Sequence, residues 1–184
     1  MPITIPQPLP LGRTAGDFVS AEGSGVFPIS AVSTATIGAA NNLYLTPRRV
    51  LGTETYDQIV VEATTGGALG KCRAGCFANN RGRPGALLLD SGEIDLTATE
   101  VDAVSISLTV ADCWVWDFIV FNNTVPVMRG MTTNFSSVVS RLTNNTTGLI
   151  GSLHAAHAFG AAPATCPTAT QGDNRWFRIQ YRIA

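Results

Sequence analysis

Apolar and polar residues alternate most regularly between residues 104 and 110. The apolar positions are Val104, Ile106, Leu108 and Val110, and the polar positions between them are Ser105, Ser107 and Thr109. Because successive side chains of a strand point to opposite faces, this spacing predicts a β-strand with one buried face and one solvated face.

Residues 113–121 are apolar on both faces of the strand that they would form. Trp114, Trp116, Phe118 and Val120 fall on one side, and Val115, Ile119 and Phe121 fall on the other. This pattern is typical of a central strand that is covered on both sides. We therefore expect Trp114 and Trp116 to lie in the core or at a subunit interface.

Further strand signals follow at short intervals from Leu43 onward. We expect strands over residues 56–63 and 71–78, two short strands over 86–89 and 93–96 around Ser91-Gly92, and a last strand that alternates from 177 to 183. Residues rich in turn formers separate them, at 64–67 and 79–85. Strands from the two ends of a domain commonly pair in sandwiches.

Two segments near the C-terminus differ from this pattern. Residues 134–142 place Phe135, Val138, Val139 and Leu142 at helical spacing, which predicts one short helix with Thr133 or Asn134 as its cap. Residues 143–172 show no period and predict a long loop that has a function or is held by a partner. The many short strands and turns predict an all-β fold, a jelly-roll-like β-sandwich over residues 41–184.

Residues 1–40 carry Pro at positions 2, 6, 8 and 10 and no sustained period, yet they contain many apolar residues. We expect an extended N-terminal arm that becomes ordered on a neighbouring subunit. The alternative is that one or two strands of this segment belong to the domain's own sheet. The residues expected to contact neighbouring subunits are Ile3, Ile5, Leu9, Leu11 and Phe18.

Charged residues make up only 14% of the chain, against about 25% in a typical soluble domain. Of the 12 basic residues all but Lys71 are arginine, which is enriched at protein interfaces, although a GC-rich genome would give the same bias. The net charge is −1 and no basic cluster exceeds Arg48-Arg49, which argues against a nucleic-acid partner. No apolar run is long enough for a membrane span or a signal peptide.

The four cysteines are Cys72, Cys76, Cys113 and Cys166. Without a secretory signal we expect reduced thiols in a protein made in a bacterial cytoplasm. Cys72 and Cys76 would lie on one face of one strand, about 13 Å apart, which is too far for a disulfide. Neither their spacing nor a second pair matches a zinc site.

The residues that could carry chemistry are few. His154 and His157 could meet a metal where copies converge on a symmetry axis, but surface histidines of a loop are the simpler interpretation. Two of the three carboxylates of Asp90, Glu93 and Asp95 could form a pair for acid-base chemistry, or the group could bind calcium. A turn at this place would also explain why acidic residues gather there. We expect no enzyme activity, no cofactor and no metal site.

Aromatic residues offer one further possibility, a platform for stacking on sugars. Trp176 lies on the polar side of the last expected strand beside Arg178, and both could contact a glycan or a neighbouring subunit. His154 and His157 are candidates for the same surface.

Residues 71–95, KCRAGCFANNRGRPGALLLDSGEID, resemble a β-sandwich module of phage tail and virion-surface proteins. The module's pattern is R-x-G-x-[FY], an Asn/Gly/Pro turn, and PG-x-L-[LV]-x-D-x-G-x-[IV]-D. Residues 156–167, AHAFGAAPATCP, are similar to the YGALPAT stretch that often follows, with Phe159 at the Tyr place and Ala162 where Leu is usual. The resemblance covers residues 43–184 and assigns no catalytic residue.

The resemblance implies a structural protein of a bacteriophage virion, often a homotrimer, whose partners are the major capsid protein or tail proteins. Tail-fibre subunits usually attach this module to long fibrous segments, whereas here an arm of about 40 residues precedes it. We therefore expect a capsid decoration or cement protein. The alternative is a tail-fibre or receptor-binding tip that recognises a host surface glycan.

Overall fold

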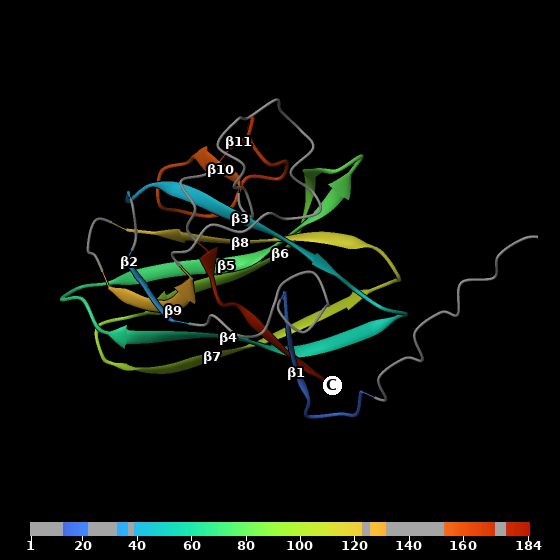
Figure 1. Cartoon of the computed structure of the whole chain (residues 1–184), viewed down its shortest axis with the longest axis horizontal. Coiled ribbons are helices and arrows are strands. Elements are labelled where there is room, and N and C mark those ends of the chain that lie inside the picture. Colours follow the sequence, from blue (N-terminus) through green and yellow to red (C-terminus); the bar gives the residue numbers. More distant parts are fainter. Residues whose placement is uncertain (1–12, 22–32, 37–38, 123–125, 132–152, 172–175) are drawn as a thin grey trace, which may run out of the picture.

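The computed structural model describes residues 13–21, 33–36, 39–122, 126–131, 153–171 and 176–184, and all of their regular elements are β-strands. These strands form two antiparallel sheets that pack face to face (Figure 1). The expected all-β sandwich is therefore confirmed. No helix that could span a membrane occurs in the part of the chain that the structure describes.

The first sheet has seven strands and is centred on the 12-residue strand β4. β4 pairs with β7 along one edge, and with β13 and β9 along the other. The strands of this sheet are β1 (Phe18–Ser20), β2 (Ser33–Thr36), β4 (Glu54–Thr65), β7 (Glu100–Val110), β9 (Val127–Met131), β12 (Trp176–Phe177) and β13 (Gln180–Ile183).

The second sheet has six strands in the order β11-β10-β3-β8-β5-β6. Its strands are β3 (Asn42–Arg49), β5 (Lys71–Asn80), β6 (Arg83–Asp95), β8 (Trp114–Phe121), β10 (Leu153–Ala156) and β11 (Thr170–Gln171). Pro47 lies in β3 beyond Leu45, the last residue that pairs with β10. Its missing N–H therefore costs no bond to that strand.

The alternation over residues 104–110 is confirmed in β7. Val104, Ile106 and Leu108 pack against the core between the sheets, whereas Ser105, Ser107 and Thr109 are exposed. The C-terminal strand keeps its expected alternation but is interrupted after Phe177, and its second part, β13, pairs with β1. First and last strands therefore do meet in the sheet.

β8 is the central strand that its apolar pattern predicts, between β3 and β5. Its Val115, Ile119 and Phe121 belong to the core between the two sheets. Its Trp116, Phe118 and Val120 belong to a second apolar cluster on the outer face of the second sheet. Trp116 is 2% exposed, which confirms the expectation of a core position.

The two short strands expected over 86–89 and 93–96 are one 13-residue strand, β6. Irregularities in the register of β5 and β6 occur between Arg73 and Gly75 and again near Phe77. Gly92 adopts a φ of +79°, which a glycine tolerates without strain, so the strand continues through Ser91-Gly92 and does not turn there.

The turn expected within residues 79–85 is confirmed as a tight hairpin between β5 and β6. Arg81 and Gly82 both have positive φ, of 52° and 85°, as a two-residue type I′ turn requires. The Gly82 N–H donates to Asn79 Oδ1 at 3.1 Å, which satisfies one donor of the turn.

Residues 13–21 and 33–36 of the expected arm pair with the sheet of the same domain, through β1 on β13 and β2 on β9. Val19 and Ala21 are buried, and the Gly16 N–H donates to the Ile183 carbonyl. This is the alternative that the sequence left open, so the folded domain begins before residue 41. Ile3, Ile5, Leu9 and Leu11 lie outside the described residues, as does the helix expected over 134–142.

The loop expected over residues 143–172 contains two short strands, β10 and β11, in its described part. Leu153 and Ala155 of β10 are buried in the outer apolar cluster, an environment that the Ala- and Gly-rich sequence does not reveal. Residues 157–169 between these strands form no regular element, as expected, apart from one isolated bridge between Ala86 and Thr165.

Gly75 occupies a place in β5 that no larger residue fits. A Cβ at this position would lie 2.0 Å from the Leu89 carbonyl oxygen and 2.8 Å from the Phe118 ring. Gly75→Ala should therefore lower the free energy of unfolding by about 1–3 kcal/mol, as overpacking of a core does. Chemical unfolding measures this loss. Gly160→Ala is the control, because its nearest atom would be 3.9 Å away, and a loss as large in the control would contradict the explanation.

Candidate functional site

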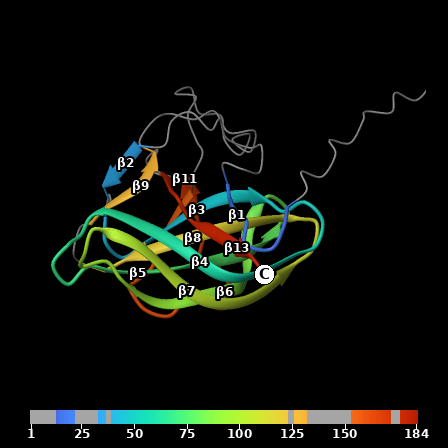
Figure 2. The same ribbon diagram turned by 90° about the horizontal axis from the view of Figure 1, so that it is seen from below.

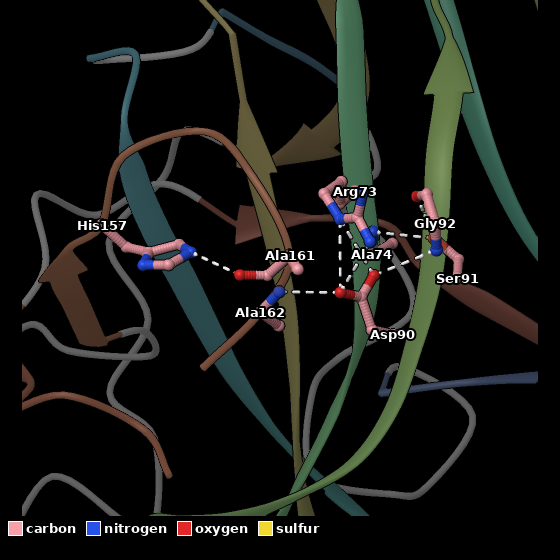
Figure 3. A network of polar contacts seen from close by, with 8 residues as sticks. All are labelled: Arg73, Ala74, Asp90, Ser91, Gly92, His157, Ala161 and Ala162. Atoms are coloured by element: carbon pink, nitrogen blue, oxygen red, sulfur yellow. Dashed lines mark hydrogen bonds and ion pairs between the residues drawn. The ribbon is translucent and has the colours of Figure 1, made fainter. Parts of the chain in front are cut away.

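Asp90 on β6 collects hydrogen bonds from three separate parts of the chain (Figure 3). Arg73 on β5 donates to both carboxylate oxygens, from Nε at 3.1 and 3.2 Å and from Nη2 at 2.9 Å. The N–H of Ala162 donates to Oδ2 at 2.7 Å, and the N–H of Gly92 donates to Oδ1 at 3.0 Å. We refer to Arg73, Asp90, Gly92 and Ala162 as the Asp90 clasp.

Two further side chains, Ser91 and His157, support the clasp. The Ser91 hydroxyl accepts from the Ala74 N–H at 3.1 Å and donates to the Gly92 carbonyl at 2.9 Å, which bridges the irregular register of β5 and β6. His157 Nε2 lies 3.2 Å from the Ala161 carbonyl oxygen, which fixes the loop just before Ala162 (Figure 3).

The clasp holds residues 157–169, here named the covering segment, over the outer face of the second sheet. The Leu87 N–H donates to the Ala164 carbonyl and the Cys166 N–H donates to the Gly85 carbonyl, each at 2.9 Å. The covering segment therefore also occupies part of the free edge of β6. Its apolar side chains against the outer cluster are Phe159, Ala162, Cys166 and Ala169.

The charge of Asp90 is stabilised although its side chain is mostly buried. Burial alone would raise the pKa of this carboxyl group, but the hydrogen bonds from Arg73, Ala162 and Gly92 outweigh it and hold the pKa below its ordinary value. Asp90 is therefore ionised at neutral pH with both oxygens occupied, an arrangement that suits anchoring rather than proton transfer.

The other two carboxylates of the acidic group have partners of their own. Glu93 forms an exposed ion pair with Lys71 at 2.7 Å, and Asp95 accepts the Thr97 N–H at 2.9 Å. Both contacts lower the pKa of their carboxyl group. The turn expected at these acids is wrong for Asp90 and Glu93, which lie within β6, but each of the three carboxylates has a structural partner. Among the described residues, no group of three or more potential metal-ligating side chains gathers.

A second polar cluster, which the sequence did not indicate, lies between the two sheets. Arg48 on β3 donates from Nε to Asp117 Oδ2 and from Nη1 to the Tyr56 hydroxyl, both at 2.8 Å. Its guanidinium group also lies 4.2 Å from the centre of the Tyr181 ring. Arg48 and Asp117 are 1% and 2% exposed, so this ion pair within the second sheet is inaccessible, and Tyr56 and Tyr181 connect it to the first sheet.

The cluster extends toward the N-terminal segment. The Tyr56 hydroxyl donates to Glu54, and Arg13 forms an ion pair with the other oxygen of the same carboxylate. The Tyr181 hydroxyl donates to the Gly75 carbonyl at 3.1 Å. Burial raises the pKa of Tyr181 well above its ordinary value, which keeps the phenol neutral as a donor. The alternation of β3 gave no signal, because both faces of this strand are buried.

The sequence-predicted site residues do not form one site. Trp176 is 4% exposed, so its ring offers no open face for a sugar, and Arg178 beside it is half-buried. His154 Nε2 lies 3.3 Å from the Thr170 hydroxyl on the neighbouring strand, whereas His157 contacts the Ala161 carbonyl. Phe18 is 51% exposed on β1.

All four cysteines are free thiols, as expected. Burial raises the pKa of Cys76 to about 12 and that of Cys166 to about 11. A thiolate is the reactive form of cysteine, so these side chains act as small apolar groups.

No protein-family model matches this chain, and no curated protein matches it. Its own residues show that the two stretches on which the resemblance rests, 71–95 and 156–167, are bound to one another. Arg73 and Asp90 come from the first stretch and Ala162 from the second.

Asp90→Asn tests the clasp. Losing the charge-assisted bonds to Arg73 should lower the free energy of unfolding by about 1.5–3 kcal/mol at neutral pH. Because the folded pKa of Asp90 is lowered, its contribution is present above the unfolded pKa of about 4 and disappears as the pH falls through the folded value. Urea unfolding at neutral pH and at about pH 3 should show the two proteins converging in acid.

Glu93→Gln is the matched control for Asp90→Asn, because it removes a carboxylate from an exposed ion pair of the same strand. It should lower the free energy of unfolding much less than Asp90→Asn does, because solvent screens an exposed ion pair. Equal losses in the two variants would show that Asp90 contributes no more than a surface charge.

The buried ion pair is tested by a double-mutant cycle. Asp117→Leu or Arg48→Met alone leaves a buried charged partner unpaired and should cost about 3–5 kcal/mol. The double variant Arg48→Met/Asp117→Leu removes both charges and should be more stable than either single variant. Chemical unfolding of the four proteins measures the coupling, and simple additivity of the two losses would contradict it.

Proposed function

We propose that this chain is a non-enzymatic structural protein of a bacteriophage virion, assembled in the host cytoplasm, that decorates and stabilises the head shell. Its partner would be the major capsid protein, and the folded domain would project from the shell as a homotrimer. The residues before Arg13 would form the attachment to neighbouring subunits.

The observation that supports this proposal is the structural role of four positions in the pattern that resembles virion-surface modules. Arg73 and Asp90 form the centre of the clasp, and Gly75 is required by the close approach of the Leu89 carbonyl. Gly92 supplies the positive φ and a donor to Asp90. These positions of the pattern therefore specify how this sandwich folds. A pattern with this role is expected in proteins that share one structural module.

The proposed mechanism is thermodynamic. A protein that binds the assembled shell but not its separate subunits stabilises the shell by mass action. Ile3, Ile5, Leu9 and Leu11 would contribute by burying apolar area, at about 25 cal/mol per Å². Phe18, exposed by 51% at the edge strand β1, would extend the same contact from the folded domain.

Because β1 and β2 belong to the first sheet, a test of the attachment to the shell must leave both strands in place. A truncation at residue 40 would remove two strands from the sheet and expose β13 and β9. Deletion of residues 1–12 leaves every described residue in place. The matched variant keeps the full length and replaces Ile3, Ile5, Leu9 and Leu11 by serine.

Both variants should unfold at the same temperature as the unmodified protein. Because each buried apolar side chain contributes about 1.5–3 kcal/mol, both should bind at least about 100-fold more weakly than the unmodified protein to particles from which this protein has been removed. Leu51→Ser, at an exposed apolar residue of the folded domain, should bind normally. Full occupancy by the protein without residues 1–12 would overturn the attachment role.

Antibody labelling of purified virions tests the location. Label over the head supports decoration of the shell. Label confined to the tail, or binding of the isolated protein to host glycans, would contradict decoration and favour the receptor-binding alternative. Absence of the protein from purified particles would overturn the virion assignment itself.

A further inference from the structure

The described edges of the two sheets differ in how they are protected. β1, β2 and β11 are only three, four and two residues long. β6 is long, but the covering segment bonds to Gly85 and Leu87 on its outer side. β7 is 11 residues long, and within the described residues its only strand partner is β4. It lies beside β4 at the lower margin of Figure 2.

β7 lacks two of the features that keep edge strands from pairing, charged residues and proline, over most of its length. Residues 103–110 contain no charged residue and no proline. The register shift sets the three steps from Ser105 to Leu108 on β7 against the two steps from Gln58 to Tyr56 on β4, so the extra residue of this irregularity lies on β7. Long, uncharged edges of this kind present free N–H and C=O groups to any strand that reaches them. The outer edge of β7 can therefore accept a further strand.

The inner face of β7 is also incompletely covered. Val104, Ile106 and Leu108 are only half-buried, although they pack against the core. On the neighbouring strand β4, Ile59 and Val61 are 0% and 1% exposed. One more strand beyond β7 would cover its apolar side chains as β7 covers those of β4.

We infer that β7 pairs antiparallel with β7 of a second copy of this chain, across a two-fold axis, and so joins two sheets into one. A strand from a second copy fits because β7 is complementary to itself. Its only acidic residues, Glu100 and Asp102, lie at one end, and its other end, Leu108 to Val110, is uncharged.

The charges select the antiparallel orientation. Parallel pairing would place Glu100 and Asp102 of the two copies side by side, and like charges opposite one another destabilise a sheet. With the axis at Ser105, antiparallel pairing sets Glu100 opposite Val110 and Asp102 opposite Leu108. On the solvent-exposed face of the joined sheet, Ser105 would lie opposite Ser105 of the second copy, and Ser107 would lie opposite Ala103 of the second copy.

This inference does not rest on the virion role. The contact is two-fold, and is therefore separate from a threefold contact within a trimer; on a particle it would link neighbouring trimers. A C2 contact uses the same patch on both copies, so every substitution in β7 acts twice.

Ser105→Lys/Ser107→Lys tests the pairing, because both side chains are exposed and the fold should tolerate them. In the dimer the lysines of the two copies would face one another, and self-association should weaken by at least about tenfold. Thr53→Lys/Thr65→Lys is the control, with the same added charge at exposed positions outside β7. Sedimentation velocity over a concentration series measures the association, and thermal unfolding verifies that each variant folds.

Cysteine cross-linking tests the register. Under mild oxidation Ser105→Cys should form a disulfide-linked dimer, whereas Thr109→Cys should not, because its two copies would lie about 27 Å apart at ~3.4 Å per residue. The unmodified protein measures the background from its own cysteines. A protein that stays monomeric up to its solubility limit, or an oligomer that the Ser105→Lys/Ser107→Lys variant leaves intact, would overturn the inference.

Discussion

β8 carries large apolar side chains on both of its faces, and the structure must cover both. The inner face packs against the first sheet through Val115, Ile119 and Phe121. The outer face, with Trp116, Phe118 and Val120, would meet water if the domain were a plain two-layer sandwich. The covering segment supplies the missing layer, and the Asp90 clasp holds it there. The hydrophobic demand of one strand thus explains why two stretches about 70 residues apart in sequence are joined.

Polar groups specify how these apolar layers fit together. Asp90 accepts donors from β5, β6 and the covering segment, so its charge fixes their relative positions. Between the sheets, Arg48 gains a hydrogen-bond acceptor from Tyr56 and a ring contact from Tyr181 only when the opposite sheet is in place. Buried charges without partners are costly, so both clusters penalise alternative packings. A rigid domain of this kind suits the proposed role in an assembly, in which attachment and self-pairing use its ends and edges.

Much of the fold was predictable because period-two patterns survive wherever one face of a strand is wet. Residues 104–110 predicted which side chains of that part of β7 face the core, and residues 113–121 predicted the central place of β8. β3 was missed because it is buried on both faces and includes Pro47 and Arg48. β6 was divided in two because Gly92, which permits a positive φ inside a strand, is also typical of turns. The partner of Asp90 could not be foreseen, because a backbone N–H such as that of Ala162 leaves no mark in a sequence.

The most direct measurement of this account is hydrogen exchange at single amides of the unmodified protein. The Leu87 and Cys166 N–H groups bond between β6 and the covering segment. If that segment is an integral layer of the domain, these two amides exchange only with the global unfolding that also exposes the amides of β8. Exchange of Leu87 and Cys166 near the rate of an unstructured chain, while β8 stays protected, would show that the segment is a dispensable loop and would contradict the account.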